Sequence, residues 1–153
     1  MKEREKENRR PAVINSMKLQ LPSLSVNESM ARAAVAAFCA QLDPNACELA
    51  DIKCAVSEAV TNCIVHAYRN TVGIIYINVR LYEENTVCIE IRDRGCGIEN
   101  IAQAREPLFT TDAEGERSGM GFTVMESFCD KVRVCSRCGK GTTITLFKRL
   151  ARR

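Results

Sequence analysis

The strongest constraint on the fold is a pair of β-rich runs near the middle of the chain. Residues 73–81 and 86–92 are rich in β-branched and aromatic side chains, and the turn-like segment Glu83-Glu84-Asn85 separates them. Runs of this composition joined by a few turn residues indicate a β-hairpin. The chain is therefore expected to contain a β-sheet.

Two helices are expected before this hairpin. Residues 17–21 alternate between apolar and polar side chains and predict a short strand that Pro22 ends. Ser25 and Glu28 have the spacing of a capping box, which predicts a first helix from there to about Leu42.

The second helix is expected to begin at Asp43 and Pro44, as an N-cap followed by a proline in the first helical position. Apolar residues at spacings of three and four continue it to about Tyr68, and these are Leu49, Ile52, Val56, Ala59 and Cys63.

The segment after the hairpin has a less regular pattern. The expected order is a glycine-rich loop over 93–97, a short helix near 100–105, a long mobile loop over 106–118, a helix over 119–128, and strands over 131–136 and 142–147. The main elements then follow the order β-α-α-β-β-α-β-β. That order predicts an α/β fold, a two-layer sandwich with helices on one face of a mixed sheet.

Length and charge limit the organisation of the chain. With 153 residues, 46% of them hydrophobic, one core is expected. Residues 1–16 are expected to form a flexible basic extension, and residues 17–153 a single domain. Removing the +2 of residues 1–10 and the +4 of residues 148–153 from the net +3 leaves −3 for residues 11–147. That balance, with 5% aromatic residues, argues against a nucleic-acid groove.

Nine cysteines are scattered along the chain. The N-terminus is charged and no apolar run follows it, so no signal peptide is expected. The odd number and the positions of the cysteines are typical of free thiols in a reducing compartment. The longest weakly polar stretch is too short to span a bilayer. We therefore expect a cytoplasmic protein with no membrane contact.

Polar side chains recur every four residues on the second helix, at Glu58, Asn62 and His66. They lie along one helix face, which is either a solvated face or a ligand-facing one. The amide oxygen of Asn62 suits Mg²⁺, and Glu58 could act as a base or orient a water molecule. His66 is expected to have a structural role.

Two glycine-containing segments could hold a nucleotide. Asp93 follows a strand, where its carboxylate could accept from the amino group of adenine, and Gly95 and Gly97 would let backbone approach the ring. Gly119 and Gly121 stand before a helix whose free amides could bind phosphate, with Arg117 adding charge. A plain turn explains either segment if it is taken alone.

Two other motifs are set aside. Gly139-Lys140-Gly141-Thr142 lacks the hydroxyl directly after the lysine and the upstream glycine that a P-loop needs. Cys135 and Cys138 form a CxxC at the end of a strand without further ligands nearby in the sequence, so neither a metal nor a redox role is expected.

The order and spacing of these motifs resemble the ATP site of the GHKL superfamily, which includes gyrase, heat-shock chaperone 90 and histidine kinases. The motifs are Glu58-x-x-x-Asn62, Asp93-x-Gly95-x-Gly97, Gly119-x-Gly121 and Gly141-Thr142. Within that superfamily, the strings 107–111 and 116–126 are similar to the family of sporulation anti-sigma-F factors, and the likeness extends over about residues 17–147.

The resemblance implies an ATP-dependent protein serine kinase. Glu58 would be the catalytic base, Asn62 the Mg²⁺ ligand and Asp93 the adenine acceptor. The remaining residues implied to bind ATP or ADP are Gly95, Gly97, Thr110, Arg117, Ser118, Gly119, Met120, Gly121, Phe122 and Thr142.

The resemblance also implies protein partners: the sporulation sigma-F factor, an anti-anti-sigma factor as substrate, and a second copy of the chain in a homodimer. Arg32 and Glu116 would contact a partner protein. Two alternatives stay open, namely an anti-sigma factor and kinase of the general stress response, and a nucleotide-dependent binding module without catalysis. A sensor histidine kinase is disfavoured because the chain has no second histidine.

Overall fold

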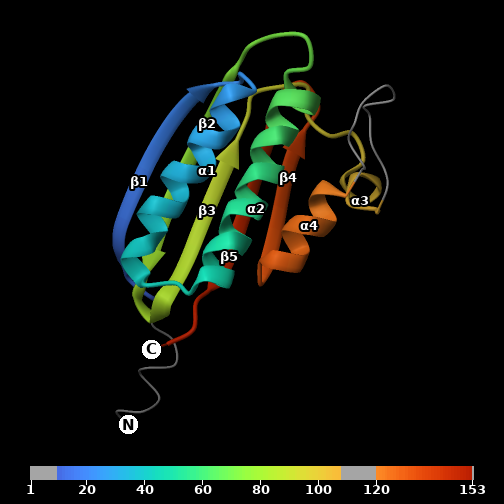
Figure 1. The fold of residues 1–153 in the computed structure, drawn as a ribbon. Coiled ribbons are helices and arrows are strands. Elements are labelled where there is room, and N and C mark those ends of the chain that lie inside the picture. The colour runs from blue at the N-terminus through green and yellow to red at the C-terminus, as the bar shows by residue number, and fades with distance from the viewer. Residues whose placement is uncertain (1–9, 108–119, 153) are drawn as a thin grey trace.

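The computed structural model describes residues 10–107 and 120–152. The chain runs from an edge strand through two helices into a hairpin, and ends in a second hairpin (Figure 1). The elements are β1 (Val13–Pro22), α1 (Val26–Cys39), η1 (Ala40–Leu42), α2 (Ala46–Asn62), η2 (Cys63–Ala67), β2 (Ile74–Tyr82), η3 (Glu83–Asn85), β3 (Thr86–Arg92), α3 (Ile101–Ala104), α4 (Gly121–Phe128), β4 (Lys131–Arg137) and β5 (Gly141–Arg149).

The five strands form one sheet in the order β1-β2-β3-β5-β4. The predicted hairpin is confirmed, with Leu81 opposite Val87 in the β2–β3 ladder. The prediction of a mixed sheet is wrong, because all four ladders are antiparallel. After β3 the chain crosses through α3 and α4 to β4 at the far edge, and β5 then returns between β4 and β3. Strands β3 and β4 run in the same direction, and β5 between them keeps them from pairing with each other.

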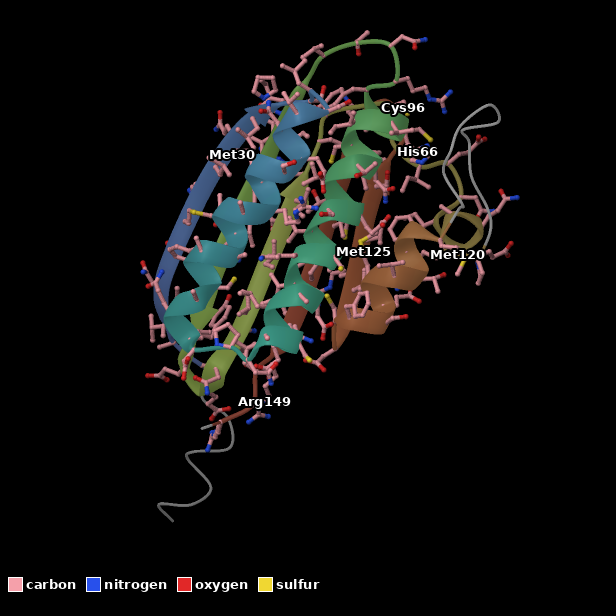
Figure 2. All side chains as sticks on the ribbon, viewed as in Figure 1. Met30, His66, Cys96, Met120, Met125 and Arg149 are labelled. Atoms are coloured by element: carbon pink, nitrogen blue, oxygen red, sulfur yellow. The ribbon has the colours of Figure 1, made fainter. Side chains whose placement is uncertain are left out.

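Helices α1, α2 and α4 cover one face of this sheet, which confirms the two-layer α/β sandwich (Figure 1). Alternate residues of the strands point into the interface between the layers, as the burial pattern of β2 shows. Met125 of α4 is fully buried between α4 and α2 (Figure 2). The largest fully buried side chains come from both layers and include Val35, Ile52, Val56, Ile77, Leu81 and Leu146.

Lys148 fixes the two layers to each other at one end. Its Nζ donates to Asp51 Oδ2 at 3.2 Å and to the carbonyl oxygen of Phe128 at 2.7 Å. One side chain of β5 thus joins α2 and the C-terminal end of α4.

The predicted capping box at Ser25 is wrong. Ser25 is itself in the right-handed helical region and caps no amide with its side chain. The carboxylate of Glu28 instead meets Arg32 at 3.3 Å, while the side chain of Asn27 donates to the Pro22 carbonyl oxygen at 2.9 Å. Helix α1 also ends at Cys39, and the 3-10 turn η1 takes the chain to Leu42.

The start of the second helix also differs from the prediction. Asn45 is the N-cap: its side chain accepts from the Glu48 amide at 2.8 Å, and Glu48 accepts from the Asn45 amide at 2.9 Å. Asp43 is in the left-handed region, with φ of 51°, and ends η1. The capping interaction is therefore two residues later than expected, with Pro44 between the two helices.

The remaining elements agree with the predictions within a few residues. Strand β1 begins at Val13, four residues before the predicted start. The predicted loop over 106–118 lies mostly outside the described residues. No helix in residues 10–107 or 120–152 is long and apolar enough to cross a bilayer.

Candidate functional site

A cleft of about 1120 Å³ lies at one end of the helical layer. It is bordered by the C-terminal half of α2, the loop after β3, helix α3, the start of α4 and the start of β5. Residues singled out from the sequence that line it are Glu58, Asn62, His66, Asp93, Gly97, Met120, Gly121, Phe122 and Thr142. Segments that are far apart in the chain thus meet at one concave surface, as expected for a ligand site.

One wall of the cleft is the polar face of α2. Glu58, Asn62 and His66 are half-buried and lie on that wall in successive turns. The α-helix ends at Asn62, and the single π-helical turn η2 follows. Figure 2 shows His66 close to Cys96, whose Sγ lies 3.4 Å from the carbonyl oxygen of His66. Because the three side chains line the cleft, this helix face is better interpreted as ligand-facing than as solvated.

Asp93 is the buried acid of the cleft, with 5% of its surface exposed. Its Oδ1 accepts from the amide of Gly95 at 2.9 Å and from that of Thr142 at 3.2 Å. Its Oδ2 lies 3.6 Å from the thiol of Cys63, a weak donor. Most of the accepting capacity of Oδ2 is therefore left for a ligand.

Burial raises the pKa of Asp93, since a charged carboxylate is less stable away from water. The amides of Gly95 and Thr142 and the thiol of Cys63 favour the ionised form and oppose that rise. The net effect is a raised pKa. A ligand that donates a hydrogen bond to this carboxylate would favour the ionised form, as the two amides and the thiol do.

The glycines of the loop permit close packing of protein backbone. A Cβ at Gly95 would lie 2.4 Å from the carbonyl oxygen of Ala67, and one at Gly97 would lie 2.3 Å from that of Arg137. Gly97 lines the cleft, whereas Gly95 is in contact with η2 behind Asp93. The close approach that the structure shows at both glycines is to protein backbone, and an approach of either glycine to a ring stays a prediction.

Thr142 occupies the start of β5 on the opposite side of Asp93. It is buried, and its hydroxyl lies 2.8 Å from that of Ser136 on β4. Ser136 also accepts from the amide of Ile98 at 2.7 Å, so it links the loop to the last hairpin. Strand periodicity places Ser136 on the inner face of the sheet but does not indicate these hydrogen bonds. Ser136 was therefore not predicted as a site residue.

Tyr68 and Cys63 were also missed as residues that shape the site. The Tyr68 hydroxyl accepts from the amide of Arg94 at 2.7 Å and donates to the carbonyl oxygen of Ile74 at 2.7 Å. It thereby holds the residue after Asp93 against the end of η2. Only an apolar role could be expected for either residue from helical spacing.

The structure describes only part of the segment that is predicted to bind phosphate. Met120, Gly121 and Phe122 begin α4 and line the cleft. Ion pairing of Arg105 with Glu126 connects the end of α3 to α4, with Nε 2.9 Å from the carboxylate oxygen. Thr110, Arg117, Ser118 and Gly119 lie outside the described residues, as does Glu116.

Arg32 lies on α1, away from the cleft. Its Nη1 is 3.3 Å from Glu28 and 3.4 Å from the hydroxyl of Ser57, the residue before Glu58. About 41% of its side chain is exposed. Arg32 is thus accessible to a protein that approaches the α1–α2 surface.

Comparison with known proteins identifies the family of the chain that forms this cleft. The family described as Histidine kinase-like ATPase domain matches residues 21–148. An anti-sigma F factor of Bacillus cereus (strain G9842) is 59% identical over 138 residues, which cover 90% of this chain and 94% of that protein. Anti-sigma F factors of Anoxybacillus flavithermus and Caldanaerobacter subterraneus are 56% and 55% identical, over 90% of this chain and 94% and 96% of their own lengths.

Two solved structures are similar in fold. A crystal structure of the RsbU and RsbW domains of a Mycobacterium tuberculosis protein has a TM-score of 0.66 at 24% identity, over 90% of this chain and 32% of that one. A blue-light activated histidine kinase of Erythrobacter litoralis has a TM-score of 0.53 at 17% identity, over 77% and 40%. With the cleft between α2, the loop after β3 and α4, these findings show that the chain belongs to the anti-sigma F factor family and has the histidine kinase-like ATPase fold.

Proposed function

We propose that this chain is an ATP-dependent protein serine kinase that also binds and inhibits the sporulation sigma-F factor. The observation that carries the proposal is that one cleft holds Glu58, Asn62, Asp93 and Thr142 together, in a chain that is 59% identical to an anti-sigma F factor. A nucleotide site with a carboxylate positioned to act as a base meets the needs of phosphoryl transfer, which are positioning and charge neutralisation.

The adenine of ATP is assigned to the Asp93 end of the cleft. Oδ2 of Asp93 would accept from the exocyclic amine, and Thr142 borders the same end. Guanine would present a carbonyl oxygen to this carboxylate and would be repelled. The buried acceptor therefore favours ATP over GTP.

The phosphates are assigned to the end of the cleft where α4 begins. Gly121 and Met120 border the cleft there. The family resemblance assigns further phosphate contacts to Thr110, Arg117, Ser118 and Gly119. Arg117 would stabilise the charge that develops on the γ-phosphate.

A magnesium ion fits the α2 wall. Asn62 contributes a neutral amide oxygen, and Mg²⁺ prefers a few protein oxygens together with phosphate and water oxygens. When bound there, the ion would neutralise phosphate charge. Within the described part of the chain no cluster of three or more His, Cys, Asp or Glu side chains could hold a metal without the nucleotide.

Glu58 is assigned as the base. It lies one turn before Asn62 on the cleft wall, so a serine hydroxyl placed beside the γ-phosphate could give up its proton to this carboxylate. The serine oxygen would bond to the γ-phosphorus while the bond from that phosphorus to the β,γ-bridging oxygen breaks, which releases ADP.

The protein substrate would be a serine of an anti-anti-sigma factor. Arg32, exposed beside Ser57, and Glu116 are proposed contacts for the protein partners. A homodimer is also proposed. Its support is the exposed apolar side chains that follow the edge strand β1 and begin α1, namely Leu24, Val26 and Met30.

A transfer assay tests the kinase proposal. The purified protein is incubated with radiolabelled ATP, Mg²⁺ and the anti-anti-sigma factor of the same organism, and the labelled residue is identified by mass spectrometry. We expect phosphoserine. Glu58→Gln should abolish transfer while ATP binding is retained, and the exposed Glu106→Gln outside the cleft is the matched control.

The outcomes separate the alternatives. ATP binding without transfer by the wild type would leave a nucleotide-dependent binding module. Transfer by Glu58→Gln at the wild-type rate would exclude Glu58 as the base. Preferential capture of a stress-response sigma factor, instead of sigma-F, would assign the chain to the general stress response.

A further inference from the structure

The face of the sheet that the helices leave open differs in charge from the rest of the chain. Helices α1, α2 and α4 all lie on the same side, so the opposite face of the five strands carries no layer of described chain (Figure 1). Strand alternation puts the buried residues of β2 on the helical side and their neighbours on the open side.

This open face is strongly basic. The cationic side chains at its strand positions are Lys18, Arg80, Arg92, Lys131, Arg133 and Arg137. Arg149 at the end of β5 is paired with Glu84. Glu90 is the only acidic residue at the open-face strand positions of the described chain. Residues 11–147 carry a net charge of −3, so this concentration of positive charge is local.

Aromatic rings support the cations of this face at two places. The guanidinium groups of Arg92 and Arg94 lie 4.8 and 4.9 Å from the centroid of the Tyr76 ring. On the other side of the face, Arg133 and Lys131 lie 5.6 and 6.0 Å from the centroid of Phe147. These contacts restrict long side chains that would otherwise be mobile, so less entropy is lost when a ligand binds them.

A hollow of about 360 Å³ lies where β3 ends and β5 begins, next to the two arginines that contact Tyr76. Arg92, Arg94 and Lys140 line it together with Thr143. In residues 10–107 and 120–152, no carboxylate lies within ion-pair distance of these three cations. Asp93 also borders the hollow, but its carboxylate already accepts from two backbone amides.

We propose that the open face of the sheet is a docking surface for an acidic polypeptide segment of a partner protein, with one carboxylate of that segment in the hollow between Arg92, Arg94 and Lys140. The hollow shares Asp93 and Thr142 with the border of the ATP cleft, but Arg92, Arg94 and Lys140 do not line that cleft, and the proposed docking does not depend on kinase activity. Four of the six strand cations are arginines, whose planar fork matches a carboxylate with two hydrogen bonds.

The arrangement favours a protein segment over a nucleic acid. Proteins that bind single strands stack bases on free aromatic faces, whereas Tyr76 and Phe147 each already have two cations near the ring. The carboxylate of Glu90 near the middle of the face would repel a continuous row of phosphates. A polypeptide can place a neutral or basic residue opposite Glu90 and carboxylates opposite the arginines.

Peptide binding tests the proposal. A fluorescent Glu-Gly repeat of about ten residues can cross the sheet, because strands are about 4.8 Å apart and an extended chain gains about 3.3 Å per residue. Fluorescence anisotropy without nucleotide should show binding that weakens with salt, and a Gln-Gly repeat should not bind. Amide chemical shifts of the full-length protein should move at Arg92, Arg133 and Thr145 and stay unchanged in α1.

Charge-removing variants locate the site. Arg94→Gln combined with Arg133→Gln should weaken peptide binding by about tenfold or more, since each removes a charge-assisted contact. Lys53→Gln, an exposed cation on the helical layer, should leave it unchanged. Both proteins should bind ATP like the wild type, which separates failure of this site from failure of the kinase site.

Three results would overturn the proposal: no peptide binding by the wild type, equal binding by the double variant, or chemical-shift changes confined to the helical layer. Tighter binding of a single-stranded DNA of equal charge, or of phosphatidylserine vesicles, would also reject the acidic polypeptide as the ligand.

Discussion

Asp93 and Thr142 are joined by hydrogen bonds in both directions. The amide of Asp93 donates to the carbonyl oxygen of Thr142 at 2.9 Å, and the amide of Thr142 donates to Oδ1 of Asp93 at 3.2 Å. The carboxylate is thus fixed by the start of β5, with Oδ2 left beside the weakly donating thiol of Cys63. A rigid acceptor of this kind can select a ligand by its donor.

Replacing Asp93 by Asn tests this acceptor. The amide oxygen of Asn could still accept from Gly95 and Thr142, so the free energy of unfolding should stay within about 1 kcal/mol of the wild type. Its NH₂ group would face the exocyclic amine of adenine, donor against donor. We expect ATP affinity to fall about 10- to 100-fold in isothermal titration calorimetry. An unchanged affinity would contradict the adenine assignment, and Glu106→Gln is the control.

The raised pKa of Asp93 predicts a pH dependence. Because burial raises the folded-state pKa above that of the unfolded chain, the folded protein takes up this proton first as the pH falls. ATP affinity should therefore decline at a higher pH than an ordinary aspartate would cause. The stability of the nucleotide-free protein should change with pH in the opposite direction to ATP affinity. Raising the pH through the same window ionises a buried carboxylate and lowers the free energy of unfolding.

Asp93→Asn separates this effect from titration of the nucleotide. ATP affinity of the variant should lack the part of the pH dependence that belongs to Asp93. If ATP affinity of the wild type and of Asp93→Asn changed with pH by the same factor across the acidic range, a group other than Asp93 would cause the pH dependence.

Local sequence patterns predicted the parts of the fold that depend on local forces. The hairpin around residues 83–85 and the apolar stripe of α2 follow from strand and helix periodicity. The capping residues were predicted poorly, because a side chain such as Glu28 chooses among several partners. Its carboxylate meets Arg32 one turn along the helix, and Asn45 caps α2 in place of Asp43.

The site was predicted to a similar extent. Glu58, Asn62 and Asp93 stand in recognisable local patterns, and the fold brings them to one cleft. Ser136 and Cys63 could not be found in the same way. The contact of Cys63 with Asp93 spans 30 residues, and the role of Ser136 depends on how the last hairpin meets the loop after β3.

Two glycines in the last hairpin offer a matched pair of variants. Gly139 and Gly141 both have positive φ, 74° and 103°. A Cβ at Gly139 would meet nothing within 4 Å, whereas one at Gly141 would lie 2.1 Å from the carbonyl oxygen of Asp93. Gly139→Ala should cost about 1 kcal/mol for its conformation alone. Gly141→Ala should cost about 3 kcal/mol, because steric overlap is added.

Urea denaturation measures both free energies. Gly141→Ala should also weaken ATP binding, since the overlap displaces the backbone of Asp93. Equal destabilisation by the two substitutions would mean that the hairpin moves away freely and that its contact with Asp93 does not position the acceptor.

The cysteines report on the occupied cleft without any substitution. Cys96 and Cys138 line it, while Cys135 is exposed on the open side of β4 in the same hairpin as Cys138. Bound ATP should slow alkylation of Cys96 and Cys138 by iodoacetamide and leave Cys135 unaffected. Cys39 and Cys63 should resist the reagent in both states, because they are buried and burial raises the pKa of Cys39 to about 12. Peptide mapping by mass spectrometry gives the rate at each thiol. Alkylation of Cys96 at the same rate with and without saturating ATP would place the nucleotide elsewhere, since a ligand at the Asp93 end of the cleft lies against the loop that carries this thiol.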